Sequence, residues 1–340
     1  MELVNVNVTE IMIPDAPKIV GLRFRTFAGP GDFPAMLEVM RASKRADGIE
    51  DGDSLESVSS FYAHLENSNP YEDMVMVEVN GQLVGYTRCT FRFEDFTGNY
   101  IYESFGLIRP EWRRRGIGRA LLHYNQQHLR QIAVGHSCPG NRYFETFLQT
   151  TQRGACILAE HEGYTPARYA YSMVRPDLEN LPDYPLPEGL EVRPARPEHV
   201  RQIWDASQEA FQDHWGYCHE GEDAYQQWLD WPYFNPELWQ VAWDGDQVAG
   251  MVLNFINTVE NEQFNRKRGY TENIAVRRPW RKRGLARALI VRSLAMLKEL
   301  GMTEAALGVD TENTSGALRV YQDCGFKPVF THINYRLEMV

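Results

Sequence analysis

Hydrophobic positions in the second half of the chain change between strand spacing and helix spacing. Residues 190–194 alternate as a strand, and residues 197–210 place apolar side chains on one side of a helix. Residues 239–243 and 247–255 flank an Asp-Gly-Asp turn and predict a β-hairpin. Further elements are predicted as a strand at 268–276, a helix at 285–300, a strand at 305–309, a helix at 315–323 and a strand at 329–338, with a matching hairpin in the first half at 74–79 and 82–91. This order predicts a mixed α/β domain.

An internal repeat divides the chain. Arg113-Arg-Arg-Gly116-Ile-Gly118 returns as Arg281-Lys-Arg-Gly284-Leu-Ala286, and 284 − 116 gives an offset of 168 residues. The same shift places residues 21–25 on residues 189–193. We therefore predict a tandem duplication, and we call residues 113–119 the first basic turn and residues 281–287 the second basic turn.

The length of the chain agrees with two domains. A chain of 340 residues is long enough for two domains of about 150 to 180 residues, each with its own hydrophobic core. Residues 176–188 are rich in proline and have no amphipathic period, which predicts a semi-rigid linker. The predicted domains are therefore residues 1–175 and 189–340.

Composition excludes several classes of protein. The net charge of −11 argues against a nucleic-acid-binding surface. We expect no membrane span and no signal segment, hence a soluble, cytoplasmic protein. Two domains in one chain make a monomer plausible. The five cysteines are widely spaced without a Cys-x-x-Cys pair, so buried thiols are expected and no metal site is predicted; they are Cys89, Cys138, Cys156, Cys218 and Cys324.

Each basic turn joins a predicted strand to a predicted helix. The first backbone N–H groups of such a helix are unpaired and lie at the positive end of its dipole, so they favour an anion. A few arginines in an otherwise acidic chain focus a multiply charged anion on the same place. The turns therefore predict a pyrophosphate site.

The spacing Arg281-x-x-Gly284-x-Ala286 resembles the acyl-CoA signature of the GCN5-related N-acetyltransferases (GNAT). The order of predicted elements is similar to that family over nearly the whole chain. The resemblance implies an α/β mixed-sheet fold of two tandem GNAT-type domains, with acetyl-CoA as the donor. The residues that it places at CoA are Ile274, Ala275, Val276, Arg281, Lys282, Arg283, Gly284, Leu285, Ala286, Arg287 and Asn313, and in the first copy Ile108, Arg113, Arg114, Arg115, Gly116, Ile117, Gly118 and Arg119.

Two residues are candidates for the chemistry of acetyl transfer. A primary amine must lose a proton before it attacks a thioester, and Glu272, on the strand before the second basic turn, is the leading base, directly or through a water. By resemblance to the family's second motif, Asn313 lies beside the cofactor and Tyr321 protonates the leaving thiolate. Backbone N–H groups near Val276 are candidates for stabilising the oxyanion. Structural roles stay open: a solvated carboxylate for Glu272, a helix cap for Asn313 and a packed aromatic for Tyr321.

The first copy lacks these groups. At the offset of 168, Glu272 corresponds to Ser104, and the neighbouring Glu103 has the opposite strand parity. At the later offset of 162, Asn313 corresponds to Thr151 and Tyr321 to Ala159. The first domain is therefore expected to be catalytically degenerate and the second to be catalytic.

The acceptor is expected between the early helices and the sheet of the second copy, around residues 211–239. This stretch is rich in aromatic and acidic side chains, which suit a small cationic amine. The candidates for substrate binding are Asp213, His214, Trp215 and Trp239. The alternatives are a core role for the aromatics, a peptide or protein N-acetyltransferase, and a CoA-binding protein without turnover.

Overall fold

The computed structural model describes residues 8–313 and 316–340. It divides into two compact units: unit 1 comprises Met1–Ala167 and Ile333–Val340, and unit 2 comprises Arg168–His332. The strands β6 (Thr165–Arg175) and β12 (Lys327–Glu338) have residues in both units. The Pro-rich residues 176–188 belong to unit 2.

Unit 1 contains a sheet in which β1 to β5 are neighbours in chain order. The pairing is antiparallel except between β4 and β5, which are parallel. Helices α1 and α2 pack on one face, and α4 and α5 pack on the other. The elements are β1 (Leu22–Arg25), α1 (Phe33–Asp47), α2 (Leu55–Ala63), α3 (Pro70–Asp73), β2 (Met74–Val79), β3 (Gln82–Glu94), β4 (Asn99–Ile108), α4 (Ile117–Ala133), β5 (Arg142–Gln149) and α5 (Arg153–His161).

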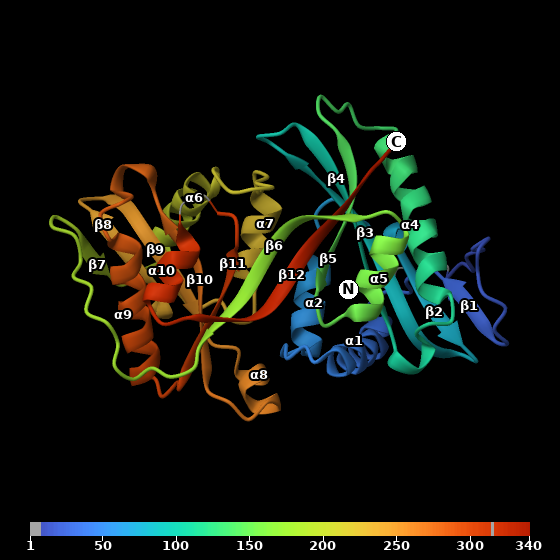
Figure 1. The fold of residues 1–340 in the computed structure, drawn as a ribbon, viewed down its shortest axis with the longest axis horizontal. Helices are drawn as coiled ribbons and strands as arrows, with labels where there is room; N and C mark the ends of the chain where they lie inside the picture. Colours follow the sequence, from blue (N-terminus) through green and yellow to red (C-terminus); the bar gives the residue numbers. More distant parts are fainter. Residues whose placement is uncertain (1–7, 314–315) are drawn as a thin grey trace. The chain divides into compact units, whose positions relative to one another are not determined.

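Unit 2 has the same plan, with strand order β6-β11-β10-β9-β8-β7. Only β10 and β11 are parallel among the pairs described in this unit. Helices α9 and α10 cover one face and α6 and α7 the other (Figure 1). The elements are β7 (Glu191–Arg193), α6 (Val200–Phe211), α7 (Glu222–Leu229), β8 (Gln240–Asp244), β9 (Gln247–Phe255), α8 (Thr258–Gln263), β10 (Arg268–Val276), α9 (Leu285–Glu299), β11 (Glu304–Asp310) and α10 (Ala317–Asp323).

Most predicted elements are confirmed. The strands at 247–255 and 268–276 have the predicted bounds, because apolar runs between turn residues define buried strands. The helix predicted at 315–323 begins at Ala317 in the described chain, and Ser315 lies outside the described residues. The short helices α7 and α8 were not predicted, since their few turns carry weak periodicity. Within the described ranges, no helix combines the length and the apolar character that crossing a membrane requires.

The Pro-rich segment has a counterpart at the start of the chain. Pro14-Asp15-x-Pro17 returns as Pro182-Asp183-x-Pro185, again at an offset of 168. Ile13 is buried against residues of α4, and Leu181 packs in the same way against the cluster formed around α9. Each unit therefore has an arm that packs beside the helix following its basic turn: residues 13–17 in unit 1 and residues 176–188 in unit 2.

A β-bulge distinguishes the two copies. In unit 2, β9 and β10 pair as Glu272↔Leu253 and then as Ala275↔Met251, so β10 contains one extra residue, and Asn273 has a φ of 45°. In unit 1, β3 and β4 pair without interruption from Gly85 to Glu94. The bulge changes the direction of β10 just before the second basic turn.

Candidate functional site

The second basic turn leaves the start of α9 open. It begins with the 3-10 helix η5 (Arg278–Trp280), and Lys282 and Gly284 have positive φ angles of 62° and 87°. Gly284 is the N-cap of α9, without a side-chain cap or an acidic residue in the first turn. A Cβ at Gly284 would meet no heavy atom within 4 Å. The unpaired N–H groups of this turn therefore face free space that suits an anion.

Arg281 fastens this turn to the protein. Its Nε donates to Val276 O over 2.9 Å, and its other nitrogens contact Asp213 at 2.6 Å and Ala210 O at 3.0 Å. Asp213 also pairs with Arg278, and the two guanidinium groups hold the pKa of this carboxyl well below its usual range. Arg281 and Asp213 thus hold the turn against the protein, and their direct binding of cofactor and substrate stays a prediction.

The other basic side chains of the turn are more exposed or contact the protein less. Arg283 donates to Glu188 O over 2.8 Å, in the arm of unit 2. Arg287 forms an ion pair with Asp323 at the end of α10. Together with Lys282, these side chains surround the open N–H groups with positive charge. The predicted residues Leu285 and Ala286 form the first turn of α9 itself, and Leu285 is buried beneath it.

Strands β10 and β11 separate beside the turn. They pair only over residues 268–270 and 304–306. Beyond this point the edge of β10 at residues 274–276, which includes Ile274 and Ala275, has no described partner strand on the β11 side. The wedge between β10 and β11 therefore presents, next to the second basic turn, a strand edge without a described partner strand, at which Val276 O accepts from Arg281 Nε.

Glu272 lies at the start of this wedge. Its Oε1 accepts a hydrogen bond of 3.1 Å from Gly308 N on β11. Burial raises the pKa of the carboxyl to about 7, against the opposing effect of the Gly308 N–H. Because Glu272 pairs with Leu253, its side chain is on the face of the sheet that α6 covers.

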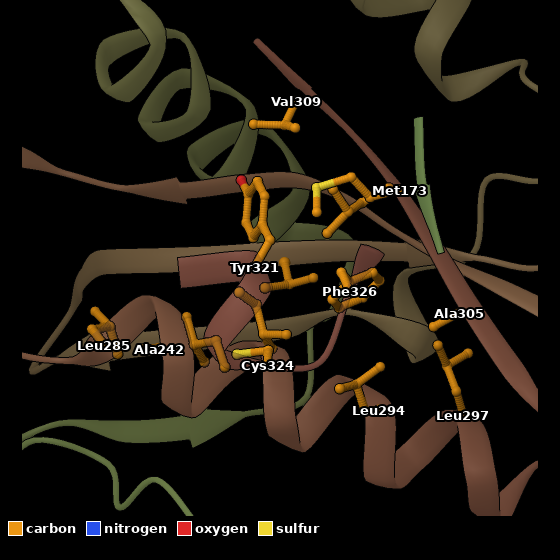
Figure 2. Close-up of a cluster of buried hydrophobic side chains, with 14 of the residues drawn as sticks. Met173, Ala242, Leu285, Leu294, Leu297, Ala305, Val309, Tyr321, Cys324 and Phe326 are labelled. Atoms are coloured by element: carbon orange, nitrogen blue, oxygen red, sulfur yellow. The ribbon is translucent and has the colours of Figure 1, made fainter. Parts of the chain in front are cut away.

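Tyr321 approaches from the opposite face. It lies on α10, is 7% exposed and belongs to the cluster that packs under α9. Figure 2 shows its hydroxyl directed towards Val309 and away from Cys324. Burial raises the pKa of Tyr321, and the negative charge of Glu272 raises it further. The structure therefore brings together a carboxyl and a phenol on the two sides of one wedge.

Asn313 and Cys324 flank α10. The N–H of Asn313 donates to Asp310 O over 3.3 Å, and its carbonyl accepts from Gly316 N. Gly316 is the N-cap of α10, so Asn313 does not cap that helix. Cys324 is fully buried and burial raises the pKa of its thiol to about 11, which confirms a packing role.

The predicted acceptor residues divide into two groups. Trp239 is 4% exposed and stacks on Trp228 with the ring centroids 5.1 Å apart, which is the environment of a core residue. Trp215 lies under the guanidinium of Arg168, 5.6 Å from it. His214 is half-buried near Asp310, and burial lowers the pKa of its imidazole. Trp215 and His214 thus lie near the end of β11, whereas Trp239 does not face solvent.

Sequence reasoning missed the contribution of β6. Arg168 pairs with Asp310 at 2.7 Å and with Glu312 at 3.0 Å. Ser172 lies opposite Gly308, and its Oγ is 2.7 Å from His332 Nε2. Arg168 and Ser172 lie beside β11 because β6 pairs with it, a non-local contact for which the sequence carries no local signal.

The first basic turn has almost the same backbone as the second. Arg114 and Gly116 have φ angles of 60° and 90°, and Gly116 is the uncapped N-cap of α4, whose first turn contains Ile117, Gly118 and Arg119. Arg113 donates to Ile108 O over 3.0 Å and pairs with Asp47, as Arg281 does with Val276 and Asp213. Arg115 lies over the ring of Trp112.

The wedge of the first copy differs, and the structure corrects one correspondence. The pair Gly85↔Ile108 between β3 and β4 matches the pair Gly250↔Val276 between β9 and β10. Three residues further along β3 and β9, Arg88 therefore matches Leu253. Arg88 pairs with Phe105, hence the counterpart of Glu272 is Phe105 and not Ser104. The fixed offset fails here because the bulge adds one residue to β10.

Comparison with known proteins agrees with this geometry. The model of the acetyltransferase (GNAT) family matches residues 36–163 and 200–326. A mycothiol acetyltransferase of Geodermatophilus obscurus is 28% identical over 317 residues, which cover 90% of this chain and 94% of that protein. The chain is also similar in fold to a GCN5-related N-acetyltransferase of Sphaerobacter thermophilus, with a TM-score of 0.71, 24% identity and coverage of 96% and 97%. A tandem GNAT protein from the clavulanic acid biosynthesis pathway gives a TM-score of 0.65, with 16% identity and coverage of 93% and 98%.

Two matches to one family model, two copies of one fold and two basic turns with the same backbone lead to a single conclusion. The donor of that family, acetyl-CoA, carries the pyrophosphate that the turns suit. The chain belongs to the acetyltransferase (GNAT) family as a tandem member with two such domains, and it is an acetyl-CoA-dependent N-acetyltransferase.

Proposed function

We propose that unit 2 transfers the acetyl group to the primary amine of a small molecule by direct attack, with donor and acceptor bound together. The observation that carries this proposal is the wedge between β10 and β11, which Glu272 and Tyr321 reach from opposite faces beside the second basic turn. Acetyl-CoA supplies an activated thioester, so the protein must position the two reactants and move protons.

Glu272 has the properties of the base. A group that accepts a proton near neutral pH works best with a pKa close to that pH, and burial raises the pKa of Glu272 to about 7. The hydrogen bond from Gly308 N holds the carboxyl in place. Glu272 therefore takes the proton of the incoming ammonium, directly or through a water.

Tyr321 has the properties of the acid. Its raised pKa keeps the phenol protonated at neutral pH, and no described group forms a hydrogen bond with its hydroxyl. A protonated phenol without another partner can give its proton to the departing CoA thiolate. Base and acid thus act on opposite sides of the acetyl group.

The second basic turn and the neighbouring strand edge are proposed to hold CoA. The open N–H groups at residues 284–287 suit the pyrophosphate, and Lys282, Arg283 and Arg287 provide charge. The edge at residues 274–276 and the loop at Asn313 flank the path to the wedge. Unit 1 repeats the turn but has Phe105 instead of a base, which supports a division in which unit 2 alone is catalytic.

The proposed acceptor is an amine that also carries hydroxyl groups, of the kind acetylated to form mycothiol. The related protein of Geodermatophilus obscurus is a mycothiol acetyltransferase. Near Glu272, Ser172 and His332 provide donors and acceptors, and Trp215 provides a ring that already contacts a cation. Such a mixed polar surface suits a hydroxylated amine better than an alkyl amine.

The test is CoA release with a panel of amines: the desacetyl form of mycothiol, glucosamine, cysteine and a short peptide. The desacetyl form should give the highest kcat/KM, and glucosamine, cysteine and the peptide should each give a lower one. A peptide with the highest kcat/KM would replace this acceptor class. Absence of turnover with every amine would contradict the proposal for small amines.

A further inference from the structure

Arg88 in unit 1 is a partly buried cation without an acidic partner. Its Nε is buried and has no hydrogen-bond partner, and none of the described carboxylates forms an ion pair with it. Burial lowers the pKa of its guanidinium. A desolvated charge without a partner costs free energy, so native proteins rarely contain one unless a ligand or counter-ion completes it.

The nearest acidic groups have other partners. Asp53 pairs with Lys44 at 2.7 Å. Asp73 lies 2.6 Å from His128 and also accepts a hydrogen bond from Asn69 N. The charge of Asp73 acts on Arg88 through space, but neither carboxylate forms a described ion pair with it.

The hydroxyl of Tyr86 is a second donor without a hydrogen-bond partner, on the same face of β3 as Arg88. Tyr86 lies two residues before Arg88 on the same face of β3, is 0% exposed, and its hydroxyl has no hydrogen-bond partner. The hydroxyl of Tyr62 is within hydrogen-bonding reach of Arg88. Three donors thus gather between α2 and β3, which is the arrangement that an anionic acceptor completes.

Aromatic rings border these donors. The guanidinium of Arg88 lies 5.1 Å from the ring of Phe61, and the ring of Phe105 is 6.1 Å from that of Tyr86. Phe105 is 44% exposed, so this border of the region faces solvent, whereas the Arg88 Nε and the Tyr86 hydroxyl lie buried behind it. At the matching positions unit 2 has Leu253 and Glu272, hence the charge of this region is inverted between the copies.

We propose that unit 1 binds a small carboxylate through Arg88 and Tyr86, with the apolar part of the ligand against Phe105. The carboxylate oxygens accept from the Arg88 Nε and the Tyr86 hydroxyl, and no covalent step follows because Phe105 replaces the base. The site is independent of acetyl transfer by unit 2. Unit 1 is therefore a ligand-binding domain with its own specificity.

The carboxylate has two possible sources with the same chemistry. One is a free acid, for which benzoate is the probe and benzyl alcohol is the uncharged control. The other is the end of an acyl-CoA held by the first basic turn, because β4 leads from Phe105 to Ile108 at that turn. Succinyl-CoA is the probe for this source, and acetyl-CoA is its control.

The experiment measures binding to the full chain by calorimetry and by the shift of the melting temperature. Arg88→Leu introduces the residue that unit 2 has at this position, and Tyr86→Phe removes only the hydroxyl. Benzoate or succinyl-CoA should bind the unsubstituted chain, about 100-fold more weakly after Arg88→Leu and about tenfold more weakly after Tyr86→Phe. Without ligand, Tyr86→Phe should not lower the melting temperature, because it removes a hydroxyl that has no hydrogen-bond partner, whereas Arg88→Leu also loses the contacts of Arg88 with Tyr62 and Phe61.

The two probes separate the sources. Benzoate binding that benzyl alcohol does not reproduce identifies a free acid, and Arg88-dependent preference for succinyl-CoA over acetyl-CoA identifies a tethered one. The proposal is overturned when neither probe binds in an Arg88-dependent way. If Arg88→Leu does not fold, unchanged affinities for both probes in Tyr86→Phe overturn it equally.

Discussion

At the scale of single residues, the raised pKa of Glu272 predicts the pH dependence of the reaction. Below about pH 7 the carboxyl is protonated and cannot accept a proton, so kcat/KM should rise as pH increases through this value. Glu272→Gln should remove this limb, lower kcat/KM at pH 7 by about 100-fold, and recover in part at high pH, where the amine is already neutral. The measurement is a pH profile of CoA release with each protein. A wild-type profile in the variant would exclude Glu272 as the base.

The same pKa gives a control for stability. The folded protein favours protonated Glu272, because burial raises the pKa of this carboxyl above its value in the unfolded chain. The contribution of Glu272 to the free energy of unfolding is therefore fully present below the unfolded-state pKa and is lost as pH rises through about 7. Glu272→Gln removes the ionisation, so its melting temperature at pH 8 should equal or exceed that of the unsubstituted protein. A loss of rate together with a lower melting temperature would indicate damage to the fold.

Tyr321 gives a second prediction at this scale. Tyr321→Phe should lower kcat by about 10- to 1000-fold while the affinity for CoA changes little, because only the donated proton is lost. The fold should be preserved, since no described group bonds to the hydroxyl. Single-turnover kinetics and calorimetry with CoA separate the two effects. An unchanged kcat would return Tyr321 to a packing role.

At the scale of elements, the two basic turns form a matched pair for mutation. Gly284→Val places a β-branched residue at a φ of 87°, over the open N–H groups at the start of α9, so the KM for acetyl-CoA should rise at least about tenfold. Gly116→Val makes the equivalent change before α4, where φ is 90°. If unit 2 alone is catalytic, the second variant should keep the KM and kcat of the unsubstituted protein. The opposite result would assign catalysis to unit 1.

At the scale of the whole molecule, the pairing of β6 with β11 predicts where the chain can be truncated to give a stable unit 2. Residues 168–175 of β6 pair with β11 over Ala170 to Arg175, and Leu178 is buried in the cluster around α9. A chain that begins at residue 189 lacks both and exposes an edge of β11. It should unfold at lower urea concentration, or with less cooperativity, than a chain that begins at residue 165. Equal midpoints and slopes would show that β6 and the arm contribute little.

The sequence by itself determined the repeat, the mixed α/β class, most strands and helices and the two basic turns. All of these depend on local periodicity, turn residues and short spacings, which neighbouring residues decide among themselves. Glu272 and Tyr321 were chosen with the help of the family resemblance, and their roles stay predictions. Only the tertiary structure decided the bulge in β10, the match of Glu272 to Phe105, the role of Arg281 with Asp213, the burial of Trp239 and the presence of β6 beside β11. These features arise from pairing and packing between residues far apart in the chain, where register and burial are set by partners that a local pattern does not identify.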